Sequence, residues 1–285
     1  MIKLIVTDMD GTFLNHHQEI TEYNRSAIEY AQSKGAEFMI ATGRNYTTIR
    51  PMLEQYHITC SCMLLNGAEF RDKAGNIVKK TPIPYEKGKE LIRLLECQGF
   101  YPEVMDSDGF YSIYSKEQAK LGMLGRMRCL HPQASEQELE ALMMDSIFYQ
   151  KLQYADSLDN LQEQGIEISK IIVFHQDRKL IEETKEKIHQ LGGLIASSSF
   201  PNNIEINDIH AQKGIALSEY IQEQGIEKEE VMVFGDGLND YSLFTEFPNS
   251  FAPVNAMKEI KEIAETIIES NDEDGVGKTI FRCLK

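Results

Sequence analysis

The feature that most constrains this chain is its beginning, where a short apolar run leads directly into two aspartates. The run from Ile2 to Val6 is rich in β-branched residues, which predicts a strand buried on both faces. Asp8 and Asp10 lie two positions apart, so an extended backbone directs both carboxyl groups to one side. Two like charges held together need a cation, a shared proton or abundant water. This stretch therefore indicates either a ligand site at the end of a strand or an ordinary solvated turn.

The composition is that of a globular protein with a strongly acidic charge. The chain has 285 residues, of which 42% are hydrophobic and 26% charged, and this length allows two domains. The 29 Lys and Arg against 45 Asp and Glu give a net charge of -16, which argues against nucleic acid or an anionic membrane as the main partner. The sequence starts without a signal-peptide pattern, and no apolar run reaches membrane-spanning length. We therefore expect a cytoplasmic protein, whose oligomeric state the sequence does not predict.

The five cysteines and seven histidines form no pattern that predicts a metal site. Cys60 and Cys62 are separated by one residue, whereas common zinc knuckles have two. His16 and His17 fall on a predicted loop just after the two aspartates. We interpret the cysteines as reduced thiols.

The two outer segments of the chain show a regular alternation of strands and helices. Thr21 is a candidate N-cap for a helix that ends near Lys34, and Pro51 is expected to interrupt or restart the next helix. The predicted strands of these segments lie at residues 2–6, 36–41, 62–68, 231–234, 250–254 and 266–269. Such alternation predicts an α/β fold with a doubly wound, mostly parallel sheet.

The middle of the chain breaks this rhythm. It contains predicted helices at residues 86–97 and 178–191, a hairpin that turns at residues 106–109, a strand at 168–176 and a second hairpin over 194–207. Grouped strands and helices of this kind predict a separate α+β domain. We therefore expect a core built from residues 1–83 and 208–285, with an α+β domain of residues 84–207 inserted into it.

Polar residues gather in four loops of the outer segments. These loops contain Asp8 and Asp10, Thr42-Gly43, Lys213-Gly214, and Asp236, Asn239 and Asp240. A nucleophilic carboxylate, a second acid, a hydroxyl, an ammonium group and further acids suit the transfer of a phosphoryl group to a carboxylate. Each loop also has a structural alternative, because Thr42-Gly43 can cap a helix, Lys213 can be an exposed first-turn lysine, and aspartates are common in turns.

In these motifs the chain resembles the haloacid dehalogenase superfamily, specifically its Cof-type phosphatases with a large α/β cap (subfamily IIB). The segments DMDGT (8–12), ATGR (41–44), KGIAL (213–217) and GDGLND (235–240) match the family's four motifs in order. The segments VNAMKEIKEIA (254–264) and ESNDEDGV (269–276) resemble its closing region. The resemblance covers nearly the whole chain and implies a Rossmann-like core with an inserted cap.

The resemblance also implies roles for individual residues. Asp8 would be the nucleophile that becomes an aspartyl-phosphate, and Asp10 would be the general acid and then the base. Mg²⁺ would be held by Asp8, the main-chain carbonyl of Asp10, and Asp236, with Asp240 supporting the metal loop. Phosphate and substrate binding would fall to Met9, Thr42, Gly43, Lys213 and Asn239. Asn66 is expected at the entrance, and the cap segment 101–114 is expected to line the substrate.

These observations predict a magnesium-dependent phosphatase of small phosphorylated metabolites, such as a sugar phosphate or a phosphorylated cofactor. The alternatives are a phosphomutase of the same superfamily, a phospho-accepting signalling domain, or a binding protein without activity. Two further segments, at 106–109 and 272–275, also read D-x-D-G. Neither follows an apolar run like that of residues 2–6, so we predict that both are turns.

Overall fold

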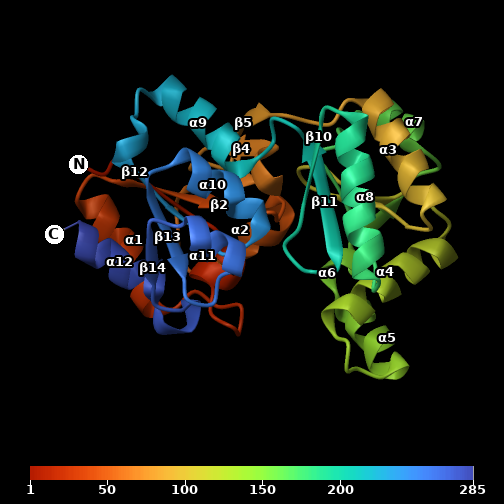
Figure 1. The fold of residues 1–285 in the computed structure, drawn as a ribbon, viewed down its shortest axis with the longest axis horizontal. Coiled ribbons are helices and arrows are strands. Elements are labelled where there is room, and N and C mark those ends of the chain that lie inside the picture. The colour runs from red at the N-terminus through yellow and green to blue at the C-terminus, as the bar shows by residue number, and fades with distance from the viewer. Residues whose placement is uncertain (285) are drawn as a thin grey trace. The chain divides into compact units, whose positions relative to one another are not determined.

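The computed structural model describes residues 1–284 and divides the chain into two compact units (Figure 1). The core unit consists of residues 1–80 and 210–285, and the inserted unit consists of residues 81–209. The predicted α/β class is confirmed, because most strands of the larger sheet are parallel and helices pack against it. The boundaries expected from the sequence lie close to those of the two units, and the independence of each unit as a domain stays a prediction.

An eight-stranded sheet forms the centre of the core unit, in the order β14-β13-β12-β1-β2-β3-β4-β5. The strands from β14 to β3 are parallel, whereas β4 and β5 are antiparallel and close one edge. Their bounds are β1 (Leu4–Thr7), β2 (Glu37–Ala41), β3 (Ser61–Leu64), β4 (Glu69–Arg71), β5 (Ile77–Lys80), β12 (Val231–Phe234), β13 (Asn249–Pro253) and β14 (Thr266–Ile268). Since β1 lies between β2 and β12, the sheet joins the two ends of the chain at its middle.

Helices cover both faces of this sheet (Figure 1). They are α1 (Glu22–Ser33), α2 (Tyr46–Gln55), α9 (Lys213–Gln224), α10 (Tyr241–Glu246), α11 (Lys258–Ile263) and α12 (Gly275–Cys283). Leu4 and Val6 of β1 pack against apolar side chains of α9, α10 and α11. On the opposite side, α1 packs against β2 and α12. All four residues of β1 are buried, as the apolar run predicts.

The first two helices test two sequence expectations. The hydroxyl of Thr21 accepts a hydrogen bond from the backbone N–H of Asn24, so Thr21 is the N-cap of α1 as predicted. The expected interruption at Pro51 is wrong, because α2 continues from Tyr46 to Gln55. A proline removes one backbone donor, and the helix on either side of Pro51 keeps its own hydrogen bonds.

The inserted unit contains a six-stranded sheet in the order β10-β11-β9-β6-β7-β8. Its strands are β6 (Glu103–Met105), β7 (Phe110–Ser112), β8 (Leu152–Tyr154), β9 (Lys170–Phe174), β10 (Leu194–Ser197) and β11 (Asn203–Asp208). Its helices are α3 (Tyr85–Cys97), α4 (Lys116–Leu130), α5 (Glu136–Asp145), α6 (Ile147–Gln150), α7 (Leu158–Glu163) and α8 (Arg178–Leu191). All pairings except β7 with β8 are antiparallel, which agrees with the α+β pattern of this segment.

The two faces of the six-stranded sheet differ in chemistry. On one face, Val104, Ile171 and Ile206 join an apolar cluster with side chains of α3, α7 and α8. Because side chains alternate along a strand, the neighbouring residues lie on the other face. There Lys170 pairs with Glu205 at 3.1 Å, and Glu103 of β6 pairs with Arg126 of α4 at 2.7 Å. The first face therefore packs through an apolar cluster, whereas the second carries buried ion pairs.

Candidate active site

Four neighbouring strands of the core unit end in the residues that the motifs single out. Asp8 follows β1, Thr42 follows β2, Asn66 lies just after β3, and Asp236 lies just after β12. The carboxyl ends of parallel strands meet at one edge of a sheet, which is where α/β proteins bind ligands. The sheet order β12-β1-β2-β3 therefore collects these polar groups at one place.

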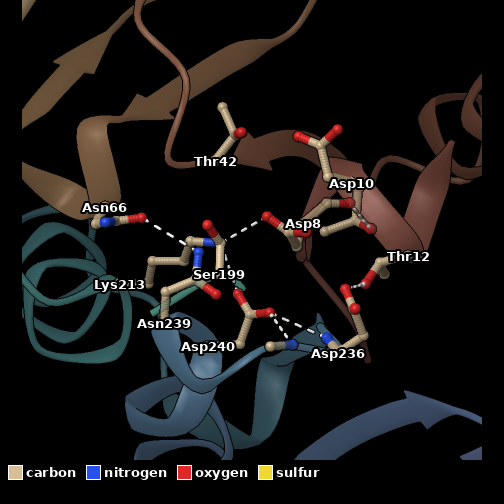
Figure 2. A network of polar contacts seen from close by, with 12 residues as sticks. Asp8, Asp10, Thr12, Thr42, Asn66, Ser199, Lys213, Asp236, Asn239 and Asp240 are labelled. Carbon is tan, nitrogen blue, oxygen red and sulfur yellow. Dashed lines mark hydrogen bonds and ion pairs between the residues drawn. The ribbon is translucent and has the colours of Figure 1, made fainter. Parts of the chain in front are cut away.

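Lys213 connects two of the acidic residues at this edge (Figure 2). Its Nζ atom donates to Asp8 Oδ1 and to Asp240 Oδ1, both at 2.6 Å. The side chain of Lys213 is 0% exposed, so the alternative of an exposed first-turn lysine is excluded. Burial lowers the pKa of Lys213, but the carboxylates of Asp240 and Asp8 outweigh burial and raise it. Lys213 is therefore a fixed cation between two carboxylates.

Asp236 completes the acidic group on the side away from Lys213. Its Oδ1 atom accepts a hydrogen bond of 2.7 Å from the hydroxyl of Thr12. Burial, together with the charge of Asp240, raises the pKa of Asp236 to about 7. Gly11 has a φ of +79°, and a Cβ atom at this position would lie 2.5 Å from Asp236 Oδ2. Only glycine fits this approach of the two loops.

Asp240 supports the loop that carries Asp236. Its Oδ2 atom accepts hydrogen bonds from the backbone N–H groups of Asp236 and Gly237, both at 3.0 Å. Its other oxygen is bound to Lys213, so Asp240 joins the loop to the lysine. This arrangement agrees with the supporting role that the family resemblance implies for Asp240.

The acidic group has the chemistry of a divalent-cation site. Asp8, Asp236 and Asp240 each offer a carboxylate oxygen, and these atoms all lie within 4.8 Å of one another. Burial raises the pKa of Asp8 well above its usual range, and Lys213 opposes this shift. Two buried carboxylates and one partly buried carboxylate beside one lysine leave negative charge that a hard cation with oxygen ligands would offset. The residues at this position therefore fit Mg²⁺.

The carboxylate of Asp10 does not join this group. Figure 2 shows it pointing away from Lys213, toward the side on which Thr42 lies. It binds Arg44, whose Nε donates to Asp10 Oδ2 at 2.8 Å and whose Nη2 donates to Asp10 Oδ1 at 2.5 Å. Sequence reasoning assigned no role to Arg44, although this residue stands in the ATGR motif. The motif drew attention to this position, but a sequence pattern does not show which residue a side chain as long as that of arginine contacts.

The remaining predicted residues surround the same strand ends. Thr42 is buried, and its hydroxyl accepts a hydrogen bond of 3.2 Å from the backbone N–H of Arg44. Gly43 lies between them in the same turn, and the N-cap of α2 is Asn45, so Thr42-Gly43 is not the helix cap. Asn239 donates to Asn66 at 3.3 Å. The side chain of Met9 is fully buried in the apolar core, so only its backbone can reach a phosphate.

The other features singled out in the sequence, namely the two D-x-D-G segments and the cysteines, do not belong to this acidic group. The segment 106–109 connects β6 and β7, and Asp272 binds the backbone and ring of His16 at 2.8 and 2.9 Å. All five cysteines are free thiols. Among residues 1–284, no helix has the length and apolar character needed to cross a membrane.

Comparison with known proteins agrees with this geometry. A family model described as haloacid dehalogenase-like hydrolase matches residues 5–280. The phosphatase YwpJ of Bacillus subtilis is 28% identical over 99% of this chain and 100% of its own length. The 5-amino-6-(5-phospho-D-ribitylamino)uracil phosphatase YwtE of the same organism is 28% identical over 99% of this chain and 98% of its own.

Solved structures show the same fold. A haloacid dehalogenase-like hydrolase from B. subtilis superposes with a TM-score of 0.84 at 27% identity, over 99% of this chain and 100% of that one. A subclass IIB sugar phosphatase of the superfamily superposes with a TM-score of 0.74 at 21% identity, over 98% of each chain. The chain therefore belongs to the haloacid dehalogenase-like hydrolases and is a phosphatase.

Proposed function

We propose that this phosphatase hydrolyses small phosphorylated metabolites through an aspartyl-phosphate formed on Asp8. The observation that carries the proposal is the contact between Lys213 Nζ and Asp8 Oδ1 at 2.6 Å, at the end of the central strand. Lys213 orients the carboxylate and brings a positive charge to the position where an anionic phosphate would bind. In a chain with a net charge of -16, such local positive charge is needed to hold an anionic substrate.

The reaction has two steps. In the first, a carboxylate oxygen of Asp8 attacks phosphorus, the bond from phosphorus to the leaving oxygen breaks, and Asp10 gives that oxygen a proton. In the second, a water molecule attacks phosphorus while Asp10 takes a proton from it. The bond from phosphorus to Asp8 then breaks, which releases inorganic phosphate and restores the carboxylate.

Residues around Asp8 would hold the phosphate and a magnesium ion. Asp8 and Asp236, with the main-chain carbonyl of Asp10, would be the protein ligands of Mg²⁺, and Asp240 would keep their loop in place. Bound Mg²⁺ offsets the repulsion between the Asp8 carboxylate and the phosphate. Thr42, Gly43, Lys213 and Asn239, with the backbone of Met9, would hold the phosphate oxygens.

The inserted unit would recognise the remainder of the substrate. The side chain of Tyr111 lies in the apolar cluster of this unit, and Tyr114 donates to Glu96 of α3 at 3.0 Å. These contacts occupy two aromatic residues of the segment 101–114. The face of the sheet that carries Lys170 and Glu205 is the better candidate, because charged groups suit a polar leaving group such as the ribityl chain of the substrate named for YwtE.

Substitution of the nucleophile tests this proposal. Asp8→Asn should lose phosphatase activity, because an amide does not attack phosphorus, and the wild-type protein should lose activity when a chelator removes Mg²⁺. Inorganic phosphate release from a panel of phosphorylated metabolites is the measurement, with Asp145→Asn at the exposed end of α5 as the control.

Two outcomes would contradict the proposal. More than trace activity in Asp8→Asn would exclude the covalent mechanism. Isomerisation of a sugar phosphate without release of inorganic phosphate would mean that the protein is a phosphomutase instead.

A further inference from the structure

Arg44 makes a two-pronged contact with Asp10 that the proposed reaction does not yet use. Its Nε and Nη2 atoms donate to the two oxygens of the carboxylate, at 2.8 and 2.5 Å. A guanidinium group that binds both oxygens fixes the plane of the carboxylate as well as its position. The contact is half-exposed, with 24% of the Arg44 side chain and 42% of the Asp10 side chain accessible.

Arg44 is itself held in place by three loops. Its backbone N–H donates to the hydroxyl of Thr42 at 3.2 Å, and its carbonyl accepts from the N–H of Leu65 at 3.1 Å. Its Nη2 atom also donates to Gln18 at 2.6 Å. Arg44 is therefore held both at its backbone and at its guanidinium group, unlike an arginine that moves freely at the surface.

The two cations of the site serve different carboxylates. Lys213 binds Asp8 and Asp240, whereas Arg44 binds Asp10. The carboxylates of Asp8 and Asp236 are both close enough to Asp10 to repel it. Without Arg44, repulsion from these carboxylates would favour Asp10 orientations that point away from the reacting group on Asp8.

We propose that Arg44 is a positioning residue that fixes the orientation of the Asp10 carboxyl group for its proton transfers. This inference rests on the proposed function, because it presumes that Asp10 exchanges protons with the leaving group and with water. The two contacts use one lone pair on each oxygen, so the remaining lone pairs stay available for proton exchange. Arg44 would thus act through Asp10 and not on the phosphate.

The dependence of rate on the leaving group separates this role from the alternatives. A good leaving group such as 4-nitrophenolate departs without a proton, whereas a poor one such as an alkoxide needs it. In magnesium-loaded Arg44→Met, kcat/KM for an alkyl phosphate should fall on the order of 100-fold, and for 4-nitrophenyl phosphate less than about 10-fold. Arg44→Lys keeps the charge without the double contact and should restore part of the loss.

Arg50→Met is the matched control. Arg50 lies in α2, and its side chain is 62% exposed and pairs with Glu54 at 2.7 Å. This variant should keep the wild-type dependence on the leaving group. The measurement is kcat/KM for a series of aryl and alkyl phosphates whose leaving groups differ in basicity. The dependence of log kcat/KM on leaving-group basicity gives one slope for each variant.

The results distinguish this inference from the proposed function. If Arg44→Met lowers kcat/KM by the same factor for every leaving group, or raises only KM, Arg44 binds phosphate or supports the fold, and the positioning role is wrong. If Asp8→Asn still hydrolyses the same series, the proposed function itself fails. Loss of activity in Asp8→Asn with an unchanged slope in Arg44→Met rejects the positioning role alone.

Discussion

Burial disfavours the ionised form of Asp236, and the free energy of unfolding therefore depends on pH. Its pKa is raised from 3.8 to about 7, chiefly by burial and then by Asp240, while the Thr12 hydrogen bond opposes the shift. Between these values the folded protein keeps a proton that the unfolded chain releases. The contribution to stability is therefore complete below pH 3.8 and is lost as the pH rises through about 7.

We therefore predict that the melting temperature of the metal-free protein decreases between about pH 5 and pH 8. Asp236→Asn cannot ionise, so its melting temperature should decrease less over the same range. Asp145→Asn, at an exposed position, should follow the wild type. Equal pH dependence in Asp236→Asn and wild type would show that this carboxyl group ionises freely in the folded protein.

At the scale of residues, the sequence predicts the position of a side chain better than its contacts. Asp8, Lys213 and Asp236 converge as expected, because each is tied to a strand end or a helix start that local patterns reveal. The contact between Arg44 and Asp10 escapes prediction, because a long flexible side chain can reach several partners. Asp240, whose side chain is short, binds two backbone N–H groups as well as Lys213, in agreement with the supporting role expected for it.

The start of α9 is the element whose packing the site depends on most directly. Gly214 follows Lys213, and a Cβ atom here would lie 2.0 Å from the carbonyl oxygen of Ser242 in α10. The backbone of Gly214 also donates to the hydroxyl of Ser242 at 2.9 Å. The two helices therefore approach closely at the residue next to the buried lysine.

Gly214→Ala should consequently push α9 away from α10 and move Lys213 from its two carboxylates. Overpacking of this kind costs about 1–3 kcal/mol, so the melting temperature should fall by several degrees and kcat should decrease. Gly125→Ala in α4 is the control, because no heavy atom lies within 4 Å of its added Cβ, and it should stabilise the protein slightly. Full activity and stability in Gly214→Ala would mean that the helices separate without cost.

Prediction of the elements succeeds where periodicity is long or burial is complete. The buried run in β1 and the amphipathic pattern of α8 are both confirmed. The short hairpin of β4 and β5 was not predicted, and neither were α6, β8 and α7, because three to six residues carry too little periodicity. The strands among them are defined by their partners in the two sheets, and α6 and α7 by their packing against α5 and α3.

At the scale of the whole molecule, the inserted unit can be removed without cutting a strand of the larger sheet. Joining Lys80 to His210 through a short flexible linker should leave a folded core, since β5 ends at Lys80 and α9 begins at Lys213. This core should still hydrolyse 4-nitrophenyl phosphate slowly, because the acidic group and Lys213 belong to it. Selectivity among metabolites should largely disappear, because remote contacts that position a substrate would be lost.

Comparison of kcat/KM for several metabolites, with and without residues 81–209, is the measurement. The control is Asp145→Asn at an exposed position of the inserted unit, which should keep the substrate order of the full chain. If the shortened core is folded and keeps the substrate order of the full chain, the inserted unit does not determine specificity.

The central place of β1 has a consequence for the synthesis of this protein. Its partner β12 ends at Phe234, so one side of β1 lacks its neighbour until nearly the whole chain has been made. At typical translation rates this interval is roughly 10 to 45 seconds. The inserted unit is continuous in sequence and is made within that interval, so it can fold first. Until the carboxyl-terminal segment has been made, the nascent amino-terminal segment exposes the unpaired edge of an apolar strand. We expect a chaperone to bind this edge during synthesis.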